Sequence, residues 1–172
     1  MEFYKVINER KSIRKYNVNK KIPDEVLDRI LNAARIAPSA CNIQPWHFMV
    51  IKDNKKKEKL KGAYRQDWFW TAPVIIVGCV DVNKAWIRGD GVSYAEVDLA
   101  IAMDHLILAA TNEGLGTCWI GAFNEIKVKD ILNIPDYIKV VAMTPLGFAA
   151  EEVKASPRKS INDIVHEETW QG

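Results

Sequence analysis

Cationic side chains gather near the start of the chain, where Arg10, Lys11 and Arg14 surround Ser12. Guanidinium groups form bidentate, charge-assisted hydrogen bonds with phosphate oxygens, and a hydroxyl adds one more donor. The cluster therefore fits a phosphate monoester. A solvated basic turn accounts for the same spacing equally well, so the cluster alone does not decide between the two.

A second cationic group stands near the other end of the chain, in the sequence PRK. It consists of Arg158 and Lys159, which follow a proline. Both side chains are also suited to an anionic phosphate. Two such groups at opposite ends of the chain suggest one site that is built from both.

The stretch APSACNIQPW combines small residues with side-chain amides. Asn42 and Gln44 can each donate and accept hydrogen bonds, so they can read the edge of a heterocycle. The small residues that precede them bring backbone groups close to a ligand without bulk; these are Pro38, Ser39 and Ala40. A cationic pocket and an amide-rich edge together indicate a ligand with both a phosphate and a polar ring.

The common nucleotide and hydrolase motifs are missing. The sequence GLGTCWIG places Trp119 where a dinucleotide-binding loop needs its third glycine, and it leads into a predicted strand instead of a helix. No lysine follows a glycine-rich phosphate loop, and no G-x-S-x-G motif is present. Ser39 has no base partner nearby in the sequence. These patterns argue against a Rossmann domain, a P-loop enzyme and a serine hydrolase.

Composition limits the remaining classes. Cys41, Cys79 and Cys118 are far apart, and neither they nor the three histidines show metal-ligand spacing, so we expect no metal site. The net charge of +2 does not favour nucleic acid, and the basic run 52–61 is interpreted as a solvated helix face. No apolar run is long enough to span a membrane, and the charged start is no signal peptide. We therefore expect a cytoplasmic protein.

Periodicity predicts alternating helices and strands in one domain. A helix begins at Pro23 and stops before Pro38, and Trp46 anchors the strand that follows. Asn124 is a candidate N-cap. The remaining helices are predicted over 2–9, 54–62, 95–114 and 125–132, and the strands over 46–52, 73–81, 116–121 and 138–148. This order indicates an α+β fold with a mainly antiparallel or mixed sheet flanked by helices.

The segment 95–114 is apolar almost all the way round, with Asp98, Asp104 and His105 as the exceptions. Such a helix must be buried on every side, and a central helix shared with a twin subunit achieves this. The loop 82–94, which precedes it, is a candidate mobile flap. The polar tail after residue 148 has too few apolar residues to fold by itself, so we expect it to lie across another surface.

Four segments occur in an order that resembles the nitroreductase family of FMN-dependent oxidoreductases: ERKSIRKY, APSACNIQPWHFMVI, GLGTCWIGAFN and PLGFAAEEVKASPRKSINDIV. The resemblance spans nearly the whole chain, with the loops 62–72 and 82–94 least covered. It implies a single nitroreductase-like α+β sandwich over 1–172 that forms an intertwined homodimer. It also implies FMN at the dimer interface and a tail, 149–172, that wraps onto the partner subunit.

The resemblance assigns roles to individual residues. The phosphate and ribityl chain of FMN would be held by Arg10, Lys11, Ser12, Arg158 and Lys159. Arg14 would lie near the pyrimidine side of the flavin, and the backbone N–H of the Gly121–Ala122 turn would face flavin N5. The segment contributed by the partner subunit would comprise Pro38, Ser39, Ala40 and Asn42. No side-chain acid is expected, because the flavin carries the chemistry.

The expected activity is hydride transfer from NADH or NADPH through flavin N5 to a nitroaromatic, a quinone or a similar flat electrophile. Two alternatives stay open: a non-catalytic FMN-binding or storage protein, and a specialised flavin-dependent desaturase or flavin-cleaving enzyme on the same scaffold. Ala40 replaces a serine that is common in the family. Cys41 beside it is either a reactive thiol or a small filler side chain.

Overall fold

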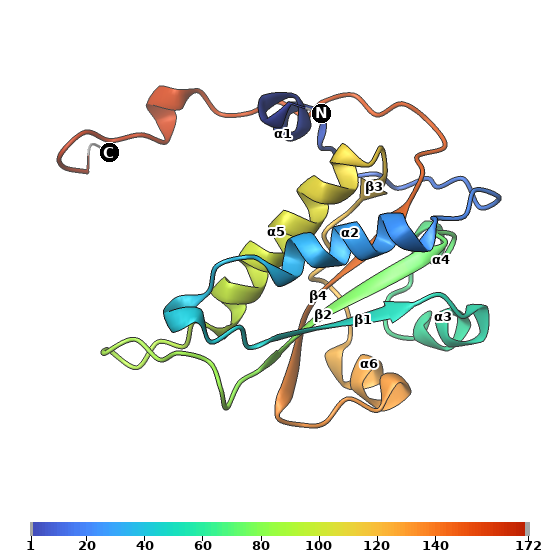
Figure 1. Cartoon of the computed structure of the whole chain (residues 1–172), viewed down its shortest axis with the longest axis horizontal. Coiled ribbons are helices and arrows are strands. Elements are labelled where there is room, and N and C mark those ends of the chain that lie inside the picture. Colours follow the sequence, from blue (N-terminus) through green and yellow to red (C-terminus); the bar gives the residue numbers. More distant parts are fainter. Residues whose placement is uncertain (1, 171–172) are drawn as a thin grey trace.

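The computed structural model describes residues 2–170. Its centre is a four-stranded antiparallel sheet with the strand order β1-β2-β4-β3 (Figure 1). The strands are β1 (Trp46–Ile51), β2 (Val74–Asp81), β3 (Gly116–Thr117) and β4 (Ile138–Gly147). All of β2 is buried, which agrees with the continuous apolar run in its sequence.

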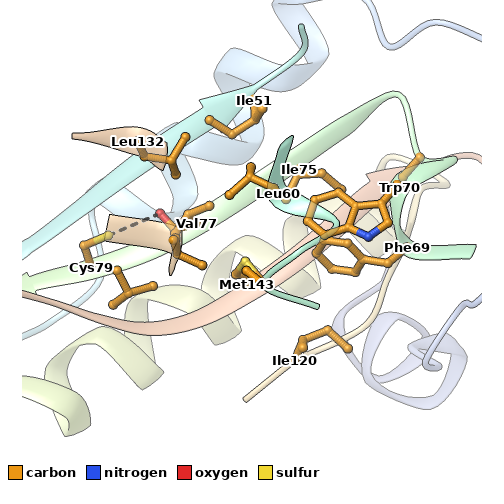
Figure 2. Close-up of a cluster of buried hydrophobic side chains, with 14 of the residues drawn as sticks. Ile51, Leu60, Phe69, Trp70, Ile75, Val77, Cys79, Ile120, Leu132 and Met143 are labelled. Atoms are coloured by element: carbon orange, nitrogen blue, oxygen red, sulfur yellow. Dashed lines mark hydrogen bonds between the residues drawn. The ribbon is translucent and has the colours of Figure 1, made fainter. Parts of the chain in front are cut away.

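Side chains of β2 alternate between two cores, because successive residues of a strand point to opposite faces. On one face, Val74 and Ile76 pack against α2 (Asp24–Arg35) and α5 (Ala95–Asn112). On the other face, Ile75 and Val77 belong to a cluster that includes residues of three shorter helices (Figure 2). These helices are α3 (Asn54–Leu60), α4 (Asp67–Trp70) and α6 (Glu125–Leu132).

Helix α5 lies very close to the sheet at Gly78. A Cβ atom at this position would be 3.1 Å from Met103 Sδ and 3.3 Å from a Leu99 methyl group. The β2–β4 register also shifts between Gly78 and Cys79. A glycine and a β-bulge together let the backbone bend where the long helix crosses it.

The structure confirms the predicted α+β fold and most of its elements. It differs from the sequence analysis at α4, at Lys57 and in the strand predicted over 116–121, of which only Gly116–Thr117 forms β3. Helix α4 was not predicted, because four residues are too few to show a periodicity. Lys57, expected on a solvated helix face, is only 7% exposed. Within one chain, Val97, Ala100 and Asp104 leave an exposed stripe on α5, as expected of a helix whose burial a twin subunit would complete.

The segment 82–94, the candidate flap, is a short hairpin-like excursion with hydrogen bonds of its own. Arg88 N–H donates to Val92 O at 2.9 Å, and Tyr94 N–H donates to Trp86 O at 2.9 Å. The rings of Trp86 and Tyr94 meet edge to face with centroids 4.9 Å apart. The segment projects from the body beside the N-terminus of α5 (Figure 1).

The segment after helix α1 (Phe3–Glu9) and the start of the tail meet at the β3 edge of the sheet. Helix α1 leads into an extended segment in which Ile13 N–H donates to Thr117 O at 2.8 Å. The start of the tail is fixed beside it, because Ala150 N–H donates to Lys15 O at 3.0 Å. Beyond this point the tail runs past α1 and away from the body (Figure 1).

The last part of the tail has little cover from its own chain. A single 3-10 turn (Ile161–Asp163) is closed by a capping box between Ser160 and Asp163. The large apolar side chains around it are exposed: Ile161, Ile164, Val165 and Trp170. Within residues 2–170, no helix is both long and apolar enough to cross a membrane.

Candidate functional site

A cavity of about 320 Å³ joins the two cationic groups that the sequence places at opposite ends of the chain. Five cationic side chains line it: Arg10, Lys11, Arg14, Lys154 and Arg158. None of them is ion-paired with a carboxylate among residues 2–170. Ser12 and Ser156 add hydroxyl groups. An uncompensated positive charge of this size with two hydroxyl donors suits a polyanionic group such as a phosphate.

The N-terminal half of this cavity is fixed by β3. Ser12 forms a parallel bridge with Thr117, which sets the direction of the backbone between Arg10 and Arg14. The contact requires Gly116, because a Cβ atom there would be 2.5 Å from Ile13 Cγ1. The phenol of Tyr16 also donates to Ile13 O at 2.6 Å. The cations are thus carried by a backbone that is tied to the sheet.

The C-terminal half of the cavity comes from the extended tail. Lys154, Ser156 and Arg158 line it together, whereas Lys159 is not among the lining residues. Val153 and Ala155 line the cavity as well, so the tail contributes 153–156 as a continuous run together with Arg158. The sequence analysis missed Lys154 and Ser156, because neither belongs to the PRK motif on which it relied. The predicted role of Lys159 stays a prediction.

Arg14 lies near enough to Tyr64 for its charge to act on the phenol, although Tyr64 does not line the cavity. Desolvation raises the pKa of the Tyr64 phenol, and the positive charge of Arg14 partly opposes the shift. The turn that contains Gly121 and Ala122 ends close to Tyr64, because Asn124 N–H donates to Ala63 O at 2.9 Å. Both residues of the turn are exposed. Within residues 2–170, neither of their amide groups has a protein acceptor, so both can serve a ligand.

The amide-rich segment is a tightly constrained loop around a short 3-10 turn (Ala40–Asn42). Cys41, Asn42 and Gln44 have φ values of 50°, 55° and 54°, which side chains with a Cβ atom rarely adopt. Two hydrogen bonds hold this conformation: Ser39 Oγ accepts from Gln44 N–H at 2.9 Å, and Asp98 Oδ1 accepts from Ala40 N–H at 2.9 Å.

This loop and the cationic cavity lie at opposite ends of α5. Asp98, which holds Ala40, is in the first turn of the helix, whereas Thr111 near its end lines a small cavity together with Lys11. At 1.5 Å per residue, the two ends are about 20 Å apart. Within one chain the structure therefore does not bring Pro38, Ser39, Ala40 and Asn42 into the cavity of Arg10 and Arg158.

Comparison with known proteins identifies the fold. The model of the nitroreductase family matches residues 7–64 and 58–148. The chain belongs to the nitroreductase family. A putative NADH dehydrogenase/NAD(P)H nitroreductase from Methanothermobacter thermautotrophicus is 35% identical over 99% of this chain and 88% of its own length.

Two solved members of the nitroreductase family share the fold closely. A family protein from Clostridium difficile superposes with a TM-score of 0.92 at 30% identity, covering 99% of this chain and 100% of its own. An FMN-dependent nitroreductase from the same species has a TM-score of 0.84 at 28% identity, covering 96% of this chain and 98% of its own. Among residues 2–170, no group of three or more His, Cys, Asp and Glu side chains could hold a metal ion.

Proposed function

We infer that this chain is an FMN-dependent NAD(P)H oxidoreductase. The observation that carries the inference is the cavity in which the N-terminal Arg10, Lys11 and Ser12 meet Arg158 of the tail, in a chain of the nitroreductase family. Names of relatives point the same way, since they include an NAD(P)H nitroreductase and an FMN-dependent nitroreductase. When bound, FMN supplies hydride transfer between a reduced nicotinamide and an acceptor.

We propose that the cavity holds the FMN phosphate. Its volume of about 320 Å³ and its polar lining suit the phosphate end and part of the ribityl chain better than the flat, apolar ring system. Arg14, whose charge acts on Tyr64, would lie near the ring, where a guanidinium stabilises negative charge that develops on reduction. The free amide of Gly121 is the proposed donor at the reacting edge.

The rest of the site is proposed to come from a second copy of the chain. The separation of about 20 Å along α5 means that the loop of Ser39 and Asn42 cannot complete the cavity of its own chain. The exposed stripe of Val97 and Ala100 on α5 and the exposed apolar side chains of the tail need a partner surface. An intertwined homodimer, in which 149–172 wraps onto the partner, meets both needs.

We propose a ping-pong reaction in which NADH or NADPH leaves before a nitroaromatic, a quinone or another flat electrophile binds. The alternative is a protein that stores FMN without turning over. Relatives named as an NAD(P)H nitroreductase and an FMN-dependent nitroreductase favour catalysis over storage.

Anaerobic reduction tests the proposed activity. The purified FMN-loaded protein should bleach on addition of NADH or NADPH, and its colour should return when a quinone or a nitroaromatic is added. Dithionite serves as the control reductant, because it reduces bound flavin without a nicotinamide site. Protein that bleaches with dithionite but with neither nicotinamide would support the storage alternative instead.

A further inference from the structure

A second cavity, of about 690 Å³, lies where the loop before α2 meets α3, α4 and the start of β2. It shares no lining residue with the phosphate cavity described above. Apolar side chains form much of its wall: Val18, Ile22, Trp70, Pro73 and Val74. Its volume is in the range of pockets that bind small organic molecules. Neither the proposed activity nor the comparisons account for it.

Lys57 is the unusual residue of this cavity. Its side chain lines the cavity from α3, yet the residue is only 7% exposed. The ammonium donates to Ala72 O at 3.1 Å. Within residues 2–170, no carboxylate forms an ion pair with it. A buried ammonium without an ion pair is costly, and desolvation lowers the pKa of Lys57 although the negative charge of Asp53 partly opposes this shift.

Two further lysines extend the positive charge along the wall. Lys52 is already paired with Asp24 at 2.6 Å. Lys21 has no carboxylate partner among the residues that the structure describes. The cavity therefore has two lysines without an ion pair, the buried Lys57 and the exposed Lys21. Its one lining carboxylate, Asp24, is the partner of Lys52.

The apolar wall has a fixed shape. Trp70 is buried and packs edge to face against Phe69, with ring centroids 4.6 Å apart (Figure 2). Its indole N–H is already used, because it donates to Tyr64 O at 2.9 Å. Trp70 therefore offers the cavity apolar surface and no free donor.

We propose that this cavity binds a small organic anion, with its carboxylate or phosphate at Lys57 and its apolar body against Trp70 and Pro73. The anion compensates the buried ammonium, and the apolar body fills the space between the 18–22 loop and β2. A purely structural role for Lys57, as a tie between α3 and Ala72 O, predicts no such ligand. The two accounts differ in what happens when the ammonium is removed.

The test uses the full-length, FMN-loaded protein and three related probes in calorimetric titrations. The probes are 2-naphthoate, 2-naphthyl phosphate and the neutral 2-naphthylmethanol. Lys57→Met removes the charge and keeps the length of the side chain. Lys56→Met, at an exposed position of the same helix, makes the same change in net charge and serves as the control.

We expect Lys57→Met to weaken binding of the better anionic probe at least about tenfold, because a charge-assisted contact is lost. Lys56→Met should bind like the wild type, and the neutral probe should bind weakly to all three proteins. Whichever anion binds more tightly identifies the preferred head group. Binding that is equal in the wild type and in Lys57→Met belongs to another site and overturns the proposal.

A second variant tests the cavity without touching Lys57. Val18 is 61% exposed at its wall, so Val18→Trp should place an indole in the space without disturbing the core. This variant should also lose at least about tenfold in anion affinity. If Lys57→Met does not fold, the affinity of Val18→Trp tests the proposal in its place. Unchanged affinity in Val18→Trp would show that the apolar body does not occupy this cavity.

Discussion

Asp98 Oδ1 accepts a hydrogen bond from the backbone N–H of Ala40 at 2.9 Å, although 58 residues separate them in sequence. Asp98 is 1% exposed, and its Oδ2 has no hydrogen-bond partner within the described part of the chain. The contact joins the first turn of α5 to the loop of positive φ values. A buried side chain thus fixes backbone that, on our proposal, contacts FMN.

Asp98→Ala should release this loop and weaken FMN binding. The amide of Ala40 loses its acceptor, and the strained residues after it lose the constraint that orders them, at a cost of about 1.5–3 kcal/mol. Asp98→Asn, which keeps an acceptor, should retain more of the affinity. Fluorescence quenching measures the affinity, and Asp130→Ala, at an exposed position of α6, is the control. Wild-type FMN affinity in Asp98→Ala would show that the loop is not part of the site.

Arg10→Ala or Ser12→Ala should weaken FMN binding and leave riboflavin binding almost unchanged. Each removes a donor proposed for the phosphate, which costs on the order of 1.5–3 kcal/mol for a charged partner. Lys15→Ala is a matched control, because Lys15 is paired with Glu151 at 3.0 Å and does not line the cavity. Titration of apo protein with both flavins gives the comparison. Equal losses for the two flavins would contradict the phosphate assignment.

Val97→Glu should break the proposed dimer. Val97 is 45% exposed in the single chain, and a glutamate there would place a charge in the interface. Ile126→Glu on α6 is the control, since Ile126 is 72% exposed and away from α5. Light scattering should show twice the chain mass for the wild type and the control. A wild-type protein that is a flavin-loaded monomer would rule out both the dimer and the shared site.

Truncation after Ala150 should release FMN and destabilise the dimer together. It removes Arg158 from the cavity, and it also removes the exposed apolar side chains of the tail. Arg158→Ala alone should lower FMN affinity and leave the dimer intact, because it removes charge and little buried area. Flavin titration and mass measurement are made in parallel. A truncated chain with full FMN affinity would exclude the tail from the site.

Cys79 gives a prediction for alkaline pH. Burial raises the pKa of its thiol to about 12, so the folded state favours the neutral form more strongly than the unfolded chain does. The neutral Cys79 thiol therefore adds its full contribution to the free energy of unfolding below about pH 9, and this contribution is lost as the pH rises towards 12. Cys79→Ala should lose less stability than the wild type over this interval in urea titrations. Parallel curves for the two proteins would contradict this contribution.

Accessibility of the cysteines can be measured directly. Cys41 is exposed, whereas Cys79 and Cys118 are buried. Iodoacetamide at pH 8 should therefore modify one thiol per native chain, identified as Cys41 by peptide mass, and all three thiols in urea. Rapid modification of a second thiol in the native protein would show that the core opens on the timescale of the reaction.

Sequence periodicity predicted the elements with long buried faces. The apolar run of β2, the N-cap of α6 at Asn124 and the helix after Pro23 all follow local rules, and the structure confirms them. It could not predict α4, where Trp70 and its neighbours form a single turn held by tertiary packing. The burial of Lys57 was also hidden, because a lysine among lysines gives no sign of the cavity beside it.

Prediction of the candidate site from sequence had a similar limit. Residue types alone indicated that Arg10 and Arg158 suit one anion, and the cavity joins them. Sequence could not reveal that Asp98 holds Ala40, because such a contact depends on how α5 crosses the sheet. It also could not give the distance along α5 between the 38–44 loop and the cationic cavity.

That distance has a genetic consequence. Suppose that each site combines the cavity of one chain with the 38–44 loop of the other. A chain mutated only at Arg10 then still contributes an intact loop, and a chain mutated only at Asp98 still contributes an intact cavity. Co-expressing two such inactive variants should restore activity, because one site of every mixed dimer is assembled from intact halves. With random pairing, roughly a quarter of all sites would recover. Two alleles that are individually null would then complement each other within one cell.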